Sequence, residues 1–153
     1  MDPGVPQRGA VLSRIYLDTS LLVSALLHEQ GTAAAHRYLL EQQAGTWLIS
    51  TWVNTEFASA LSLKCRSGVI SRDELMACWQ SFQTLREKRL QVLQLEHADF
   101  ETAARLCLAD VPLRAGDALH LALCQRQRGV LATLDQGLAR AALHHQLPLA
   151  MIA

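Results

Sequence analysis

The sequence has 153 residues, half of them apolar, and its 14 basic residues balance its 14 acidic ones. This length suits one domain with a buried core, and a balanced charge argues against binding to nucleic acid or a membrane by net charge alone. No apolar run approaches the length of a secretory signal or a membrane span. The four cysteines lack the Cys-x-x-Cys spacing of a zinc site, so we expect free thiols in a cytoplasmic protein that does not enter a membrane.

Short strand-like runs alternate with helical patterns from residue 14 onward. Residues 1–13 contain four Pro and Gly residues and no periodic pattern, so we expect a flexible extension before a domain at 14–153. The predicted strands are 15–17, 47–49, 90–95 and 130–134, with a last strand or edge segment at 147–152. The predicted helices are 20–27, 32–43, 51–66, 71–88, 98–109, 115–128 and 136–145. This alternation indicates an α/β fold with a parallel sheet of four to five strands between two layers of helices.

Several residues predict where the helices begin and which faces they bury. Ser20 and Thr32 are suitable N-caps, and Ser71 with Glu74 has the spacing of a capping box. Apolar side chains recur at helical intervals within 71–88, so one face of this helix is buried in the core or forms a dimer surface, with the core favoured. The residues of this face include Trp79, Phe82 and Leu85.

Four acidic residues stand in otherwise apolar or small-residue segments and are the candidate functional residues. Asp18 and Asp135 each follow a predicted strand, at the edge where open α/β sheets hold their ligands. Glu56 lies in the first turns of the helix after the second strand, and Asp117 lies near the start of the helix before the fourth. Apart from Arg114, no Arg or Lys lies within three positions of any of them. We expect the four carboxylates to converge on one edge of the sheet.

Carboxylates that converge need a counter-charge. Two of them about 4 Å apart repel each other by about 4 kcal/mol at an effective dielectric constant of 20, and a bound divalent cation reverses that sign. A ligand set of carboxylates without His or Cys suits hard cations. The sequence therefore predicts a site for Mg²⁺, with Mn²⁺ as a substitute, and so a function in phosphate chemistry.

Other phosphate-handling folds do not fit these residues. A phosphatase of the haloacid dehalogenase type would have a second Asp two positions after Asp18, where this chain has Ser20. A P-loop or a dinucleotide-binding fold would have a glycine-rich turn after the first strand, and residues 18–22 contain no glycine. A response-regulator receiver would have a Lys near its end, and no Lys follows Lys88.

Four segments that contain these acids resemble, in order and spacing, the motifs of the PIN-domain ribonucleases and in particular of the VapC toxins of bacterial toxin–antitoxin pairs. The segments are YLDTS at 16–20, TEFA at 55–58, LRAGDALHLA at 113–122, and TLD at 133–135 followed by LARAA at 138–142. Each motif alone is weak, but four in sequence are specific. Three residues depart from the usual pattern: Gly116 replaces a more usual Ala or Ser and is expected to weaken the helix start, while Trp52 and Trp79 are expected not to touch the site.

The resemblance implies a PIN-like three-layer fold and a metal-dependent endoribonuclease. Asp18, Asp117 and Asp135 would hold one or two Mg²⁺ ions, with Glu56 as a further ligand or as an acceptor behind them, and the metal would activate water for attack on an RNA phosphodiester. Residues beside the acids could steady the carboxylates or contact the substrate, although a helix cap or a local turn explains the hydroxyls as well. These residues are Thr19, Ser20, Arg114 and Thr133.

Two questions stay open at the level of the sequence. His120 lies three positions after Asp117 and could act as a general base, but a packed, hydrogen-bonded histidine is the favoured reading. The resemblance also implies a toxin that is a homodimer and is neutralised by a small cognate antitoxin. The alternative is a PIN-like module that binds RNA or a protein without cutting, which the complete set of four acids disfavours.

Overall fold

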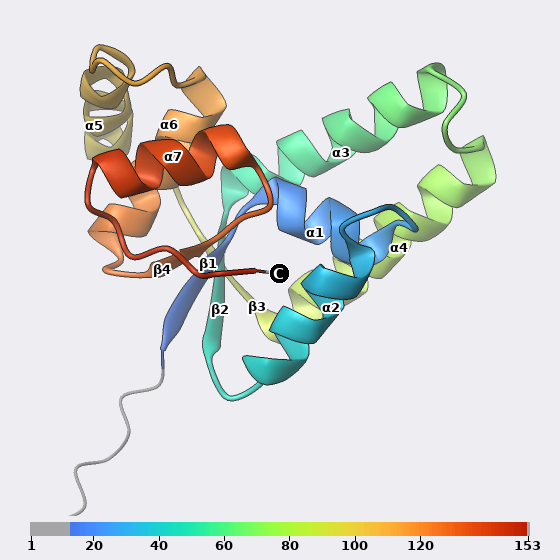
Figure 1. Cartoon of the computed structure of the whole chain (residues 1–153). Helices are drawn as coiled ribbons and strands as arrows, with labels where there is room; N and C mark the ends of the chain where they lie inside the picture. Colours follow the sequence, from blue (N-terminus) through green and yellow to red (C-terminus); the bar gives the residue numbers. More distant parts are fainter. Residues whose placement is uncertain (1–12, 153) are drawn as a thin grey trace, which may run out of the picture.

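Four parallel strands form the central sheet, in the order β3-β2-β1-β4 (Figure 1). The strands are β1 (Arg14–Leu17), β2 (Thr46–Ser50), β3 (Leu90–Leu93) and β4 (Val130–Ala132). The computed structural model describes residues 13–152. The predicted extension at 1–13 therefore lies outside the described residues except for Ser13, whose carbonyl accepts a hydrogen bond from the Thr46 N–H at 2.9 Å.

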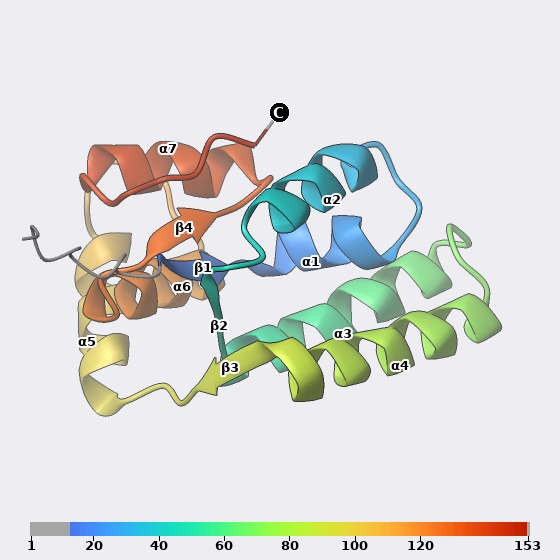
Figure 2. The same cartoon turned by 90° about the horizontal axis from the view of Figure 1, so that it is seen from below.

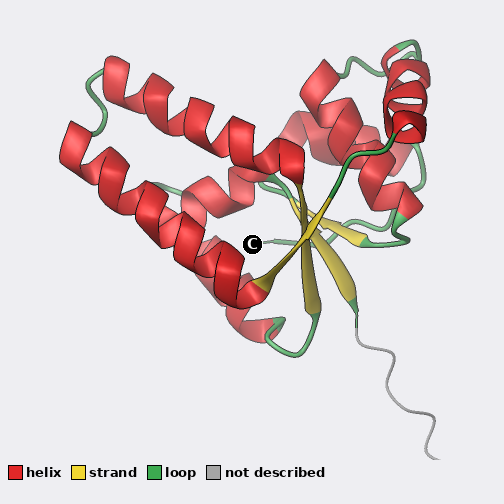
Figure 3. Cartoon of the chain, turned by 180° about the vertical axis from the view of Figure 1, so that it is seen from behind, coloured by secondary structure: helices red, strands yellow, loops and turns green. Residues whose placement is uncertain are grey.

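Helices cover both faces of the sheet, as the alternation of strands and helices predicted (Figure 2). They are α1 (Thr19–Leu26), α2 (Thr32–Glu41), α3 (Thr51–Arg66), α4 (Arg72–Arg89), α5 (His97–Cys107), α6 (Ala115–Arg126) and α7 (Gln136–His144). Successive side chains of a strand point to opposite faces. Ile15 and Leu17 accordingly pack against α1–α4, whereas Tyr16 between them packs against α5–α7. Figure 3 shows these two groups of helices on either side of the strands.

The fourth strand and the segment after α7 are shorter than predicted. β4 ends at Ala132 rather than at residue 134, because the next backbone N–H groups bind side chains: the Leu134 N–H donates across the sheet edge to Ser20 Oγ, and the Asp135 N–H donates to nearby Thr133 Oγ1. The expected last strand at 147–152 makes one isolated bridge, from Leu149 to Leu131. That segment is the edge segment of the prediction, and the sheet of the described residues has four strands. β3 likewise ends at Leu93 instead of residue 95, where the paired part of β2 ends.

The caps of two helices differ from the prediction, and a third agrees with it. Ser20 lies inside α1, and the N-cap is Asp18, whose Oδ1 accepts from the Leu21 N–H at 3.1 Å. The N-cap of α2 is Gly31 rather than Thr32, because Thr32 Oγ1 is occupied in the loop before the helix. The capping box of Ser71 and Glu74 at the start of α4 is confirmed, with hydrogen bonds of 3.2 and 2.7 Å.

Aromatic side chains pack between α3 and α4, on the side of the sheet that is covered by α1–α4. Phe82 is fully buried and stacks on Phe57 with ring centroids 4.3 Å apart, and Trp79 lies 5.6 Å from Phe82. With Leu85 also packed on this core, the apolar face of α4 is a core face, as favoured from its sequence. The cysteines are free thiols, as expected; Cys78 and Cys124 are buried, whereas Cys107 is exposed.

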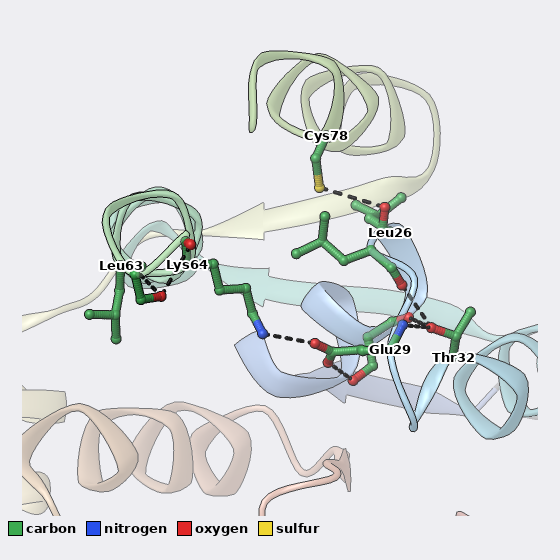
Figure 4. Close-up of polar contacts among 9 residues, drawn as sticks. Leu26, Glu29, Thr32, Leu63, Lys64 and Cys78 are labelled. Atoms are coloured by element: carbon green, nitrogen blue, oxygen red, sulfur yellow. Dashed lines mark hydrogen bonds and ion pairs between the residues drawn. The ribbon is translucent and has the colours of Figure 1, made fainter. Parts of the chain in front are cut away.

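The loop between α1 and α2 is fastened to α3 by a small polar cluster (Figure 4). The carboxylate of Glu29 accepts from Ser24 Oγ at 2.5 Å and pairs with Lys64 Nζ at 2.9 Å. Thr32 Oγ1 accepts from the Glu29 N–H and donates to the Leu27 carbonyl. These contacts fix α1 relative to α3, and the same two helices carry Asp18 at one N-terminus and Glu56 near the other.

Candidate active site

A cavity of about 360 Å³ lies where the carboxyl ends of β1 and β4 meet the starts of α1, α3 and α6. All four acids singled out from the sequence line it, which is the convergence expected at this edge of the sheet. Three of the four flanking candidates, Thr19, Ser20 and Arg114, also line it, and Thr133 lies just behind. The remaining lining residues are Ser59, Ala60 and Leu63 of α3 and His120 of α6.

Asp18 forms the floor of this pocket and is only 3% exposed. Its Oδ1 accepts from Ser20 Oγ at 2.8 Å and from the Leu21 N–H, and its Oδ2 accepts from Thr133 Oγ1 at 2.8 Å. Burial raises the pKa of Asp18 above its usual range, although the charge of His120 and these hydrogen bonds act in the opposite direction. The two hydroxyls therefore bridge the end of β1 to the end of β4 through one carboxylate.

Glu56 reaches the pocket from α3 and is held by donors from two other elements. Its Oε2 accepts from Thr19 Oγ1 at 2.6 Å and from His120 Nε2 at 2.6 Å. Burial alone would raise the pKa of Glu56, but the hydrogen bond and charge of His120 outweigh it, and the pKa lies below its usual value. Burial also works against protonated His120, yet the Glu56 partner and the nearby charges of Asp18 and Asp117 place its pKa above 6.5. The two residues therefore form an ion pair.

Asp117 and Asp135 lie on the outer side of the pocket with far fewer partners. Asp135 is exposed and its Oδ1 accepts from the Leu138 N–H at 2.8 Å, which caps α7. Among the described residues, no hydrogen bond holds the side chain of Asp117. Burial raises the pKa of Asp117, and the charges of Asp135 and Glu56 raise it further, while His120 and Arg114 lower it. The outer side of the pocket thus carries negative charge that the described residues do not neutralise.

The donor atoms of this pocket fit a hard divalent cation. The four acids supply carboxylate oxygens, which Mg²⁺ and Mn²⁺ prefer, and the mutual repulsion at Asp117 is of the kind a cation relieves. Within residues 13–152, no three His, Cys, Asp or Glu side chains lie close enough together to form a ready-made metal site.

Two residues of the site were not recognised from the sequence. His120 was read as a packed histidine, and it is indeed buried and hydrogen-bonded, but its partner is one of the four acids. The expectation that Trp52 does not touch the site is wrong: a Cβ placed on Gly116 would lie 3.0 Å from Trp52 Nε1 and 2.6 Å from Glu56 Oε1. Gly116 makes room for both side chains. The sequence did contain a signal for this contact: Trp52 and Gly116 both depart from the usual family pattern, and the small Gly116 leaves the volume that the large Trp52 side chain needs.

Solved structures with the same fold include three bacterial proteins. VapC20 of Mycobacterium tuberculosis is 18% identical, with a TM-score of 0.67 over 83% of this chain and 94% of that one. FitAcB of Neisseria gonorrhoeae is 15% identical, with a TM-score of 0.65 over 90% and 96%. VapBC2 of Rickettsia felis is 18% identical, with a TM-score of 0.63 over 92% and 99%. At these identities the likeness is one of fold.

The family is shown by the sequence itself. Comparison with curated proteins finds no match. The model of the PIN domain, however, matches residues 15–143, a stretch that begins in β1 and ends in α7 and contains all four acids. This match and the fold confirm the resemblance seen in the four motifs: the chain belongs to the PIN domain family.

Proposed function

We propose that this protein is a metal-dependent endoribonuclease that hydrolyses RNA phosphodiester bonds, with Mg²⁺ as its cofactor and Mn²⁺ as a substitute. The observation that carries the proposal is the convergence of Asp18, Glu56, Asp117 and Asp135 from four separate elements on one pocket. A binding scaffold has no physical need to keep carboxylates that raise one another's pKa together. Membership of the PIN domain family supports the same reading.

The four acids have different roles in this proposal. Asp117 and Asp135 are the mobile ligands, because few hydrogen bonds restrain them. Asp18 is a fixed ligand, oriented by Ser20 and Thr133. Glu56 is a further ligand or an acceptor behind the others, because His120 and Thr19 already hold one of its oxygens. A bound Mg²⁺ would supply a Lewis acid for the phosphoryl oxygen and lower the pKa of water.

The residues at the rim would hold the substrate. Arg114 is exposed at the N-cap of α6 and lines the pocket beside Asp117, where its guanidinium can pair with a phosphate of the RNA backbone. Leu63 is 60% exposed on the α3 wall and offers an apolar surface to an unstacked base. In this proposal, Arg114 would hold a phosphate beside the acids and Leu63 would contact a base on the α3 side.

The names of the similar structures point to a toxin of a toxin–antitoxin pair. VapC20 is described as a toxin that cleaves the sarcin–ricin loop, and VapBC2 and FitAB as complexes bound to DNA fragments. By extension we propose that this chain is the toxin partner of a small antitoxin, acts as a homodimer and works in the cytoplasm. The free cysteines fit such a reducing compartment. Among the described residues no helix is both long and apolar enough to cross a membrane.

Cleavage assays test the nuclease. A panel of structured and single-stranded RNAs is incubated with the protein in Mg²⁺, in Mn²⁺ and in EDTA, together with Asp18→Asn and the control Asp110→Asn, an exposed acid outside the pocket. We expect cleavage only with metal, a loss of at least about 100-fold in Asp18→Asn and none in the control. Cleavage in EDTA, or full activity of Asp18→Asn, would refute the proposal. RNA binding without cleavage would favour the non-catalytic module.

Expression in a bacterial host tests the toxin. We expect growth arrest by the natural chain but not by Asp18→Asn, and recovery when the product of the adjacent small reading frame is co-expressed. Co-purification of the two products identifies the antitoxin, and light scattering of the isolated chain determines the oligomeric state. A harmless monomer with no such partner would contradict this part of the proposal.

A further inference from the structure

A chain of hydrogen bonds runs from the middle of the sheet to the pocket. Tyr16 of β1 is fully buried, and its hydroxyl lies 2.9 Å from His120 Nδ1. His120 of α6 is 2% exposed, and its Nε2 lies 2.6 Å from Glu56 Oε2. Thr19 Oγ1 donates to the same oxygen at 2.6 Å. Four elements, β1, α6, α3 and α1, therefore meet in one polar chain that ends at a single carboxylate.

The geometry fixes the proton and the orientation of the imidazole. An ionised carboxylate can only accept, so the proton of the short contact lies on Nε2 of His120 and is donated to Glu56. The Tyr16 hydroxyl holds the other ring nitrogen, and the two rings also pack with centroids 5.7 Å apart. A ring held at both nitrogens in a buried site cannot turn without breaking two hydrogen bonds.

The two carboxylate oxygens of Glu56 have different surroundings. His120 and Thr19 both donate to Oε2. The other oxygen, Oε1, lies against Gly116 at the start of α6, one residue before Asp117. Rotation of the carboxylate is therefore restrained, and Oε1 stays on the side of Gly116 and Trp52.

We propose that His120 is the positioning residue of this site: held by Tyr16, it fixes the carboxylate of Glu56 in the one orientation in which it serves the metal. The inference rests on the proposed function, and it assigns His120 no contact with substrate or metal. Partners of this kind behind a ligand typically change metal affinity or activity by about 10- to 100-fold.

A set of His120 and Tyr16 variants separates positioning from a structural role. His120→Gln keeps a donor near the position of Nε2, whereas His120→Leu fills the space without one. Tyr16→Phe removes only the hydrogen bond between the Tyr16 hydroxyl and His120 Nδ1. Leu106→Ala, a buried change on α5 outside the pocket, controls for lost stability. For each folded variant, Mn²⁺ affinity is measured by electron paramagnetic resonance, and kcat and KM for RNA cleavage are measured at saturating Mn²⁺.

We expect Mn²⁺ affinity to fall at least about 10-fold in His120→Leu and to recover in His120→Gln. Tyr16→Phe should lie between, and Leu106→Ala should bind Mn²⁺ like the natural chain. At saturating Mn²⁺ the loss in His120→Leu should appear in kcat rather than in KM. A folded His120→Leu with unchanged Mn²⁺ affinity and kcat would overturn the positioning role while leaving the nuclease intact. A natural chain that neither binds Mn²⁺ nor cuts RNA would overturn both.

Discussion

The inner and outer sides of the acidic pocket are built differently. On the inner side, Asp18 accepts three hydrogen bonds and Glu56 accepts two, all from neighbouring elements of the fold. On the outer side, Asp135 accepts one bond that caps its own helix, and among residues 13–152 none reaches the Asp117 carboxylate. The inner carboxylates belong to the architecture of the domain. The outer ones are held by fewer hydrogen bonds and are therefore the carboxylates that we expect to bind an external partner.

Removing an outer charge should separate activity from stability. In Asp117→Asn we expect RNA cleavage to fall by at least about 100-fold. The pKa of Asp117 is raised in the folded protein, so its ionised form costs stability at neutral pH, and the amide should increase the free energy of unfolding in EDTA by about 0.2–1 kcal/mol. Quenched-fluorescence RNA cleavage and urea denaturation measure the two effects. If Asp117→Asn were less stable than the natural chain, Asp117 would contribute to the fold, and the difference between inner and outer acids would be contradicted.

Removing an inner carboxylate should instead damage the fold. Asp18→Ala leaves the Ser20 and Thr133 hydroxyls and the Leu21 N–H without their acceptor, so the free energy of unfolding in EDTA should fall by about 1–3 kcal/mol. Urea denaturation of Asp18→Ala beside Asp117→Ala is the direct test of the comparison. Equal losses in the two variants would mean that the inner and outer acids do not differ in this way.

A methyl group added at two glycines probes the same difference by size. In Gly116→Ala the new Cβ would lie 2.6 Å from Glu56 Oε1, and that side chain is pinned by His120 and Thr19, so we expect Mn²⁺ affinity to fall about 10-fold. Gly137→Ala is the matched comparison, because its Cβ would lie 3.1 Å from Asp135 Oδ1, a contact that a shift of a few tenths of an ångström relieves. Equal affinities in the two variants would contradict the restraint on Glu56.

The smallest expected effect is a pH dependence of stability that comes from the ion pair between His120 and Glu56. The pKa of His120 is raised above 6.5 in the folded state, so its contribution is complete below pH 6.5 and is lost as the pH rises through the folded pKa. In EDTA, Tm of the natural chain should therefore decline above pH 6.5 more steeply than Tm of His120→Gln. Parallel Tm curves from differential scanning calorimetry would refute the charged pair.

Much of this arrangement could be predicted from the sequence, because apolar runs mark the strands and the acids that follow them are then placed at one edge of the sheet. The apolar runs 15–17 and 47–49 gave the central strands, and placing Asp18 and Asp135 after strands was enough to bring them to one edge. The capping box of α4 was equally readable, because both of its partners lie within one turn of sequence.

The remainder depended on contacts between segments far apart in the chain. β4 ends early because Leu134 binds Ser20, 114 positions away, and no local pattern records that bond. Ser20 was expected to cap α1, but it donates to Asp18, which takes the cap itself. The fit of Trp52 beside Gly116 likewise appears only when α3 and α6 are placed side by side. Local rules identified the acids but could not identify what holds them.

The bond between Thr133 and Asp18 spans 115 positions of sequence and has a consequence for how the protein folds. β1 is a central strand, yet its partner β4 is the last strand to leave the ribosome, and parallel pairings of such sequence separation form slowly. A growing chain that lacks β4 and the residues after it has neither the Thr133 donor to Asp18 nor Asp135 itself. The pocket is therefore incomplete throughout most of synthesis, and the nuclease proposed here would be harmless to the RNA of its own ribosome until the domain closes.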